Sequence, residues 1–359
     1  MTKEQPPESN KFGGDASLCP HGNFAGSGCE ACAREQKEQS QPALKEIESL
    51  VEKSSFTRST TASPECTIER SGKTFTIESI EQADHPDIDK IQAMMVKAFS
   101  EEEVEPEEIM RSAIEGKDPW GHECVPLRYY TVKDEQGEVL AFCSGGLLDM
   151  KDTAGKSTGE SVFLTTFAMT DKDKGVLGAT YEAYISAIIG AAQEAQAQGK
   201  KLSFVAGPTE ASSEKFWNAT GWKRIYADTS SGDQKSLREL KYVEPSLDFD
   251  PATGEPTSDQ AVYEHLMVQA FGDRQITKEN VRSITQAYSD WSEWPENAFD
   301  SPEAYARSQE YMRSTREQLQ SELNRGGELT FLNQRERQRA IRHGSTVDEH
   351  VDADRELNY

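Results

Sequence analysis

Hydrophobic and polar positions in the first half of the chain follow patterns typical of β-strands. Residues 73–80 alternate between polar and apolar side chains and predict a strand. Two apolar runs follow at 127–132 and 139–148, and the Asp-Glu-Gln-Gly sequence at 134–137 predicts a hairpin turn between them. A further apolar, β-branched run covers 163–169 and predicts another strand.

Other segments carry the three-to-four-residue spacing of amphipathic helices. One helix is predicted to begin near Asp87, and a second is predicted at 106–114. The longest helix follows the turn at 171–178 and ends at Gln198, because Gly199 is a typical helix stop. Its apolar side chains recur on one face, which predicts that this face covers the sheet.

Residues 259–343 show helical periodicity and predict a helical region attached to the main domain. Four helices are expected, at Asp259–Phe271, Thr277–Trp291, Ser301–Asn324 and Asn333–His343. Ser301 is a favourable N-cap, and Pro302 stands at the first helical position, where its missing N–H is tolerated.

The turn between strand 163–169 and the long helix has features of an anion-binding site. Gly175 and Gly178 allow backbone N–H groups to approach a ligand closely. The N-terminus of the helix adds partial positive charge. Two lysines add further charge at 171–174, and two aspartates there oppose them. The turn therefore predicts a phosphate site in outline.

Two short motifs near this turn resemble those of the GNAT family of acetyltransferases. The sequence Trp-Asn-Ala-Thr-Gly-Trp at 217–222 is similar to the family's Tyr-x-x-x-Gly-Phe motif. Lys172 and Gly175 match the start of the family's Arg/Gln-x-x-Gly-x-Gly/Ala pyrophosphate turn, and Leu177 replaces its second small residue. The order of strands and helices over residues 72–245 also resembles the family.

The resemblance implies an α+β fold with a GNAT-like mixed, mostly antiparallel sheet flanked by helices. The sequence adds an N-terminal zinc knuckle-like segment and a C-terminal helical region. The predicted segments are a Cys/His knuckle-like segment with a disordered tail at 1–40, a flexible linker at 41–71, a GNAT-like acetyltransferase domain at 72–246, a linker at 247–258, the helical region at 259–343, and a disordered acidic tail at 344–359.

The resemblance also implies acetyl-CoA as co-substrate and direct transfer of its acyl group to an amine. Family members hold the pantetheine arm on backbone N–H groups of the first of two splayed strands, which here would be those of Phe167, Ala168 and Met169. The pyrophosphate-binding turn would contribute Lys172, Lys174, Gly175, Val176 and Gly178.

The motifs do not identify the residues that transfer protons. The amine must lose a proton before attack, so a carboxylate or a water chain serves as base, and Glu160 is the candidate carboxylate. The family's acid is commonly a tyrosine, but Trp217 stands at that position and an indole N–H does not readily give up its proton. Tyr226, Ser212, Ser213 or solvent could protonate the thiolate instead. The alternative is a catalytically inactive acyl-CoA sensor or interaction module docked through the zinc knuckle.

Composition narrows the classes of partner. The formal net charge of −24 disfavours nucleic-acid binding, because an acidic chain repels phosphate backbones. No run approaches the ~20 apolar residues of a membrane span, and the polar N-terminus lacks a signal-peptide core. Six cysteines without a secretion signal favour the cytoplasm. We expect an amine acceptor, either a small molecule or a protein, and a protein partner at the N-terminal segment, with neither nucleic acid nor membrane.

Three cysteines and one histidine cluster near the N-terminus. Cys19 and His21 form one pair, and Cys29 and Cys32 form a second, each in a glycine-containing segment. Two such pairs can surround one tetrahedral Zn²⁺; the alternative is a tail with cysteines placed by chance. Four protein ligands would leave no open position, so this Zn²⁺ would be structural.

Cys19, His21, Cys29 and Cys32 should therefore bind one Zn²⁺. Elemental analysis of protein purified without chelator should find close to one zinc per chain, because structural sites bind tightly. Less than about 0.2 zinc per chain would rule the site out. A fragment lacking residues 1–40 should keep its fold, because the core is expected to begin near Phe75.

Overall fold

The protein is described by a computed structural model over residues 45–99, 104–209, 213–231, 235–244, 249–257, 262–272 and 274–348. The chain divides into two units, Met1–Gln41 and Pro42–Tyr359, and every described residue belongs to the second. The four predicted zinc ligands lie outside the described residues. Within the described ranges, no helix has the length and apolar character to cross a membrane.

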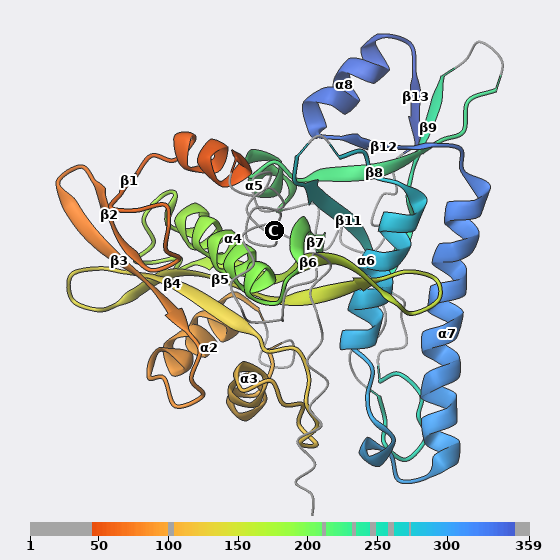
Figure 1. Ribbon diagram of the computed structural model, residues 1–359, viewed down its shortest axis with the longest axis horizontal. Coiled ribbons are helices and arrows are strands. Elements are labelled where there is room, and N and C mark those ends of the chain that lie inside the picture. Colours follow the sequence, from red (N-terminus) through yellow and green to blue (C-terminus); the bar gives the residue numbers. More distant parts are fainter. Residues whose placement is uncertain are drawn as a thin grey trace, which may run out of the picture. The chain divides into compact units, whose positions relative to one another are not determined.

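One sheet joins strands from both halves of the chain (Figure 1). Its strands follow the order β1 (Thr57–Arg58), β2 (Cys66–Arg70), β3 (Lys73–Ile80), β4 (Arg128–Lys133), β5 (Val139–Lys151), β6 (Ser157–Thr170), β7 (Lys201–Thr209), β11 (Val262–Ala270), β8 (Lys223–Asp228), β9 (Ser236–Glu239) and β13 (Thr346–Asp348). In addition, β10 (Tyr242–Glu244) pairs with β11, and β12 (Leu329–Leu332) pairs with β8. Among these strands only β6–β7 and β9–β13 are parallel. The predicted mixed, mostly antiparallel sheet is confirmed.

Helices cover both faces of this sheet. They are α2 (Asp87–Ala98), α3 (Glu107–Ile114), α4 (Ala179–Ala197), α5 (Glu214–Ala219), α6 (Lys278–Trp291), α7 (Pro302–Arg325) and α8 (Gln334–Arg342), with a short 3₁₀ turn η2 (Glu296–Ala298). Strand β5 shows the division, because its side chains alternate between faces. Cys143 packs in the cluster that contains α4 and α5, whereas Phe142 packs with α2 and α3 and Leu148 packs with α6 and α7.

Residues 45–70, predicted to be part of a flexible linker, are folded. Residues 45–52 are helical, and β1 and β2 extend the edge of the sheet. Ile47, Leu50, Phe56 and Ile68 are buried in the cluster around α4. The linker prediction is wrong for this segment. Its Ser- and Thr-rich composition is typical of a linker, but its few, widely spaced apolar residues are buried in one common core.

An ion pair also fastens this segment to α4. The Arg58 guanidinium donates to Glu182 Oε2 at 2.8 Å and to Ser186 Oγ at 2.9 Å, and Ser54 donates to the same carboxylate. Both charged side chains are at most 1% exposed. Loss of either partner would leave an uncompensated buried charge, which is strongly destabilising.

The predicted helix at Asp259–Phe271 is wrong, because residues 262–270 form strand β11 between β7 and β8. Leu266 and Val268 pack with α6 and α7, and Met267 packs with α4 on the opposite face. A strand buried on both faces loses the polar–apolar alternation that distinguishes it from a helix. The C-terminal region is consequently part of the central sheet rather than an appendage.

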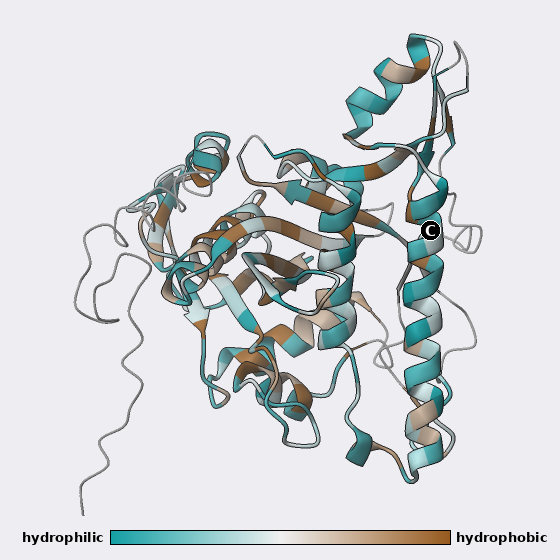
Figure 2. Cartoon of the chain, turned by 45° about the vertical axis from the view of Figure 1, so that its right-hand side comes forward, coloured by the Kyte–Doolittle hydropathy of each residue, from teal (hydrophilic) through white to brown (hydrophobic). Residues whose placement is uncertain are grey.

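The remaining C-terminal helices begin where the sequence predicted. Thr277 caps α6 by accepting the N–H of Asn280, and Ser301 caps α7 with Pro302 as its first residue. Figure 2 shows α7 as mostly hydrophilic, with isolated hydrophobic positions along its length. Its buried residues, which include Met312, Leu319 and Leu323, form one stripe toward the domain.

Removal of residues 1–41 and of residues 1–71 should therefore have different effects. The shorter deletion should leave the free energy of unfolding within ~0.5 kcal/mol of wild type. The longer one removes four buried apolar side chains, each contributing roughly 1.5–3 kcal/mol, and leaves Glu182 unpaired. Urea denaturation of both fragments tests this. Equal stabilities would show that residues 45–71 do not contribute to the core.

Candidate functional site

Strands β6 and β7 separate part-way along their length and form a fork. They pair in parallel from Glu160↔Lys201 to Leu164↔Ala206. Beyond that pair the described strands make no further pairing with each other, although β6 continues to Thr170 and β7 to Thr209. Each arm is still held on its outer edge, by β5 and by β11. The inner edge of β6 therefore presents backbone hydrogen-bonding groups without a strand partner.

A β-bulge at the start of the fork bends β6 away from β7. Gly145 of β5 pairs with Thr165, and Ser144 pairs with Phe167, so Thr166 is the extra residue. The hydroxyl groups of Ser144 and Thr166 are 2.7 Å apart. Bulges bend a strand and increase its twist. Gly145 is required here, because a Cβ at that position would overlap the Leu164 carbonyl oxygen.

Aromatic side chains close the α4 face of the fork at its apex. A Cβ built on Gly207 would lie 3.4 Å from the Trp222 ring and 2.9 Å from the Thr165 carbonyl oxygen. The Trp217 ring of α5 packs on Trp222 with centroids 4.3 Å apart. Trp222 Nε1 in turn donates to the Tyr184 hydroxyl at 2.7 Å. The apex is thus an apolar wall with one buried phenol.

Thr165 places an unsatisfied polar atom at this apex. Thr165 is only 4% exposed, and its Oγ1 has no hydrogen-bond partner among the described residues. Buried hydroxyl groups are normally hydrogen-bonded. An unpaired one beside an open fork is the kind of group that a ligand or a water molecule satisfies.

The turn at 171–178 leads from β6 into α4. Asp171 Oδ1 accepts the N–H groups of Asp173 at 2.7 Å and Lys174 at 3.0 Å. The Lys174 N–H is the main cause that holds the pKa of the Asp171 carboxyl below its ordinary value. Gly178 has a φ of +90° at the N-cap of α4, a conformation that favours glycine. Gly175 is also required, since a Cβ there would overlap the Asp171 carbonyl oxygen.

Backbone N–H groups are donors at this turn, beside the exposed Lys172 and the Arg70 guanidinium, which donates to the Leu177 carbonyl oxygen. The N–H groups of Val176, Leu177 and Gly178 have no partner among the described residues. By contrast, Lys174 pairs with Glu138 at 2.6 Å, and Asp173 is paired with Lys97. Consecutive N–H groups at a helix start are typical donors for an anion.

The structure brings most of the predicted cofactor residues to the fork. Phe167, Ala168 and Met169 lie on its β6 arm, with Ala168 toward α4 and the other two toward α2 and α3. Lys172 is exposed and makes no ion pair with a described residue. The predicted set therefore lies on one continuous stretch of chain from the β6 arm to the start of α4, with its β6 side chains on both faces of the sheet. Its role in cofactor binding stays a prediction.

The predicted proton-transfer residues are not brought together. Glu160 lies at the closed end of the β6–β7 pairing, in an ion pair with Arg274. Ser213 precedes α5, and its Oγ accepts the Trp217 indole N–H at 3.1 Å. The Tyr226 hydroxyl accepts from Arg337 of α8 at 3.2 Å. Their catalytic roles stay predictions.

A buried network of charged groups lies under α5 and α8, and sequence reasoning missed it. Arg224 bonds Glu214 at 2.7 Å and Glu239 at 3.3 Å, Arg337 bonds Glu214 at 2.6 Å, and His265 Nδ1 lies 2.7 Å from Glu239. These residues come from α5, α8, β8, β9 and β11. Their separation along the chain leaves no local motif, and the strand containing His265 was predicted to be helical.

One cluster of side chains has the composition of a metal site, but a lysine ammonium already lies among its carboxylates. Ligand atoms of Glu78, His85 and Asp87 lie within 4.8 Å of one another. The Lys133 ammonium bonds both carboxylates, at 2.6 Å for Asp87. An ammonium at this point supplies the positive charge that a metal would bring.

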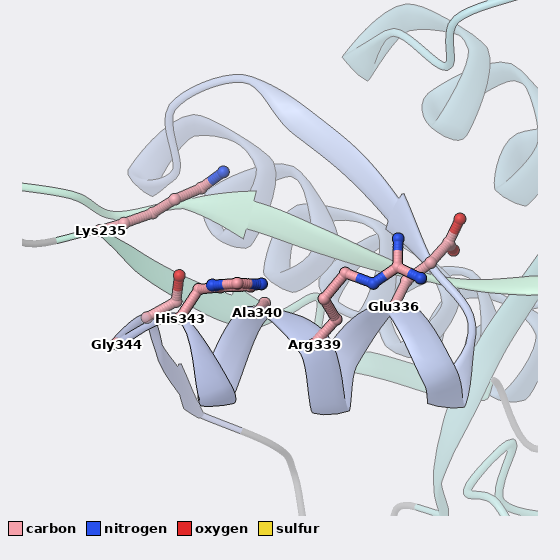
Figure 3. Close-up of a pocket in the computed structure, with 7 residues that line it drawn as sticks. Lys235, Glu336, Arg339, Ala340, His343 and Gly344 are labelled. Atoms are coloured by element: carbon pink, nitrogen blue, oxygen red, sulfur yellow. The ribbon is translucent and has the colours of Figure 1, made fainter.

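A pocket of about 710 Å³ lies beside α8 (Figure 3). Its lining includes Lys235, Arg339 and His343, all of which are exposed, together with Glu336. Glu336 is already paired with Lys223 at 2.9 Å. No unsatisfied buried polar atom is recorded among its described lining residues. The fork is therefore the better candidate site.

No protein-family model and no curated protein matches the sequence. Among solved structures, the chain is similar to a glucosamine N-acetyltransferase region of a fungal multi-domain β-N-acetylglucosaminidase, with 14% identity and a TM-score of 0.32, over 44% of this chain and 19% of that one. It is also similar to an acetyltransferase of the GNAT family from Staphylococcus aureus Mu50, with 9% identity and a TM-score of 0.29, over 55% and 99% of the two chains. TM-scores this low do not establish a shared fold, so we base the function on the geometry.

Two substitutions of Asp171 should change anion affinity in opposite directions. Asp171→Asn keeps an oxygen acceptor for the turn and removes a negative charge, so affinity for inorganic pyrophosphate should rise about two- to fivefold at low salt and less at high salt. Asp171→Ala loses the acceptor and should weaken binding, because two N–H groups are released. Calorimetric titration at two salt concentrations measures both. Equal effects of Asn and Ala would contradict this role of the carboxylate.

Proposed function

We propose that the chain is an acyl-CoA-dependent N-acyltransferase of the GNAT type, with acetyl-CoA as co-substrate and an unidentified amine as acceptor. The observation that carries the proposal is the fork between β6 and β7, whose unpaired inner edge leads directly into a turn with three unengaged N–H groups. An extended amide-containing arm that ends in a pyrophosphate fits both parts.

The two ends of acetyl-CoA would be held by different chemistry. The pantetheine amides can add to the inner edge of β6 along residues 167–169 as a short extra strand. The pyrophosphate can accept the N–H groups of Val176, Leu177 and Gly178 at the start of α4. Lys172 is exposed beside this turn and can add a screened charge. The thioester would then lie near the bulge and Thr165.

The reaction itself requires little from the protein beyond positioning. The neutral amine attacks the thioester carbonyl carbon, the C–N bond forms, and the C–S bond breaks with its electron pair passing to sulfur. The nitrogen loses one proton, and the thiolate takes up one proton through water. Binding both reactants in one fork removes much of the entropic barrier. Backbone N–H groups near the bulge can stabilise the developing oxyanion.

A second candidate function is an acyl-CoA sensor without catalysis. Trp217 is the observation that favours it, because its indole N–H is engaged by Ser213 Oγ and supplies no proton to a thiolate. Such a protein would bind acetyl-CoA in the same fork but would not release CoA.

Calorimetry with acetyl-CoA tests the site, and a coupled thiol-release assay with an amine panel separates the two candidates. Wild-type protein should bind with a Kd in the micromolar range. Gly175→Asp should weaken binding at least ~tenfold, since it breaks the turn and adds like charge. The control Lys174→Ala should change it less than ~threefold, because that exposed lysine already pairs with Glu138.

If acetyl-CoA does not bind with a Kd below about 1 mM, both candidate functions are ruled out. Binding with thiol release supports the enzyme, and binding without release for any amine in the panel supports the sensor.

A further inference from the structure

The pocket beside α8 gathers basic side chains in a chain whose formal net charge is −24. Its volume is about 710 Å³, and its basic lining side chains are Lys235, Arg339 and His343. None of the three forms an ion pair with a described residue. The acidic residue of the lining, Glu336, is already engaged, because Oε1 accepts from Lys223 at 2.9 Å and Oε2 accepts the backbone N–H at the N-cap of α8 at 2.8 Å. The pocket therefore presents basic groups that have no ion-pair partner in the described part of the chain.

Helix α8 forms one wall of the pocket because the sequence places the lining residues on one of its faces. Glu336, Arg339, Ala340 and His343 follow the spacing i, i+3, i+4 and i+7. Figure 3 shows Arg339 and His343 on the same side of the helix. Ala340 stands between them in the sequence, and its small methyl group leaves room for a ligand on this face.

A glycine turn at the end of α8 brings a second wall beside the first. Gly344 has a φ of +86°, and the Ser345 N–H donates to the Ala340 carbonyl oxygen at 3.0 Å, which is a typical glycine helix end. The chain then enters β13, which pairs in parallel with β9. The Thr346 N–H donates to the Lys235 carbonyl oxygen at 3.0 Å. This bond fixes Lys235, at the start of β9, beside the end of α8.

The helix dipole explains only part of this basic lining. Cations near a helix C-terminus are stabilised by its partial negative charge, which accounts for Arg339, Arg342 and His343. Lys235 belongs to a different element, so the end of α8 does not account for its place in the pocket. A cleft lined by charges of one sign raises the local concentration of ions of the opposite sign. The convergence of Lys235 and Arg339 therefore favours an anionic ligand.

We propose that this pocket binds a small organic phosphate ester, at a site separate from the fork. Arg339 can donate two parallel N–H groups to a phosphate, Lys235 adds a compact charge, and His343 can donate a ring N–H even when neutral. A volume of about 710 Å³ is in the range of small-molecule sites and exceeds what a bare phosphate ion fills. The oxygen atoms of Glu336 and Ser345 suit hydroxyl groups on the organic part. This inference does not depend on the proposed function.

Calorimetric titration of the full chain with glucose 6-phosphate tests the site, with glucose and inorganic phosphate as comparison ligands. Wild-type protein should bind glucose 6-phosphate with a Kd below about 1 mM and at least ~fivefold more tightly than inorganic phosphate, and it should not bind glucose. Arg339→Gln and Lys235→Gln should each weaken binding about three- to tenfold. Higher salt should weaken wild-type binding, because both side chains are exposed.

Arg342→Gln is the matched control, because Arg342 is exposed on the same helix but does not line the pocket. It removes one positive charge, as Arg339→Gln does, and should change the Kd less than ~twofold. Gly175→Asp alters the turn before α4 and should also leave this affinity unchanged. Loss of binding in Gly175→Asp would instead place the phosphate at the fork and contradict a separate site.

Equal weakening by Arg342→Gln and Arg339→Gln would overturn the proposal by showing a diffuse effect of surface charge. Inorganic phosphate that binds as tightly as glucose 6-phosphate would overturn the assignment of an organic ligand. Wild-type protein that does not bind glucose 6-phosphate below about 1 mM would overturn the site itself.

One further variant identifies a competing occupant. Residues 349–359 include Asp352, Asp354 and Glu356, whose charges complement the pocket. If glucose 6-phosphate binds only after these three residues are replaced by Asn, Asn and Gln, the acidic segment of the chain is the occupant, and the proposal is wrong. If the replacement leaves the Kd within about twofold of wild type, the pocket is open to the phosphate ester as proposed.

Discussion

The loss of pairing between β6 and β7 after Leu164 is the constraint on which the site depends. A sheet interior normally satisfies every backbone group, and here the inner edge of β6 lacks its strand partner. Neighbouring strands hold β6 and β7 in place along their outer edges. The Thr166 bulge bends β6 while β5 still pairs with it, and β11 holds β7 on its other edge. Gly145 and Gly207 allow the close approaches that the fork requires.

Electrostatics at the site are balanced locally although the chain carries a net charge of −24. In the turn before α4, Lys174 and Asp173 are paired with Glu138 and Lys97, so the donors that remain are backbone N–H groups, the exposed Lys172 and the Arg70 guanidinium at Leu177. Backbone donors hold an anion without side-chain entropy loss and with less sensitivity to salt than exposed lysines. An acidic protein can in this way keep a site for a phosphorylated ligand.

The parts that sequence predicted correctly are those with a local signal. Alternation predicted β3, glycine predicted the end of α4, and Thr277, Ser301 and Asn333 predicted helix starts, because each signal lies within a few residues. The turn at 171–178 was found for the same reason.

The parts that sequence missed depend on distant residues. Strand β11 is buried on both faces, so its apolar run did not distinguish strand from helix. The segment 45–70 was hidden by polar composition, and its key contact joins Arg58 to Glu182 far along the chain. The network of Glu214, Glu239 and His265 likewise assembles only when β9 and β11 take their places in the sheet.

We propose that the inner edge of β6 and the start of α4 together bind one acyl-CoA molecule. Hydrogen–deuterium exchange with and without saturating acetyl-CoA tests it most directly, because the backbone groups in question have no strand partner. Bound acetyl-CoA should slow exchange in peptides that cover residues 165–170 and 176–178, with no change in β12. Saturating acetyl-CoA that leaves exchange in both segments unchanged, or that protects β12 equally, would contradict this binding mode.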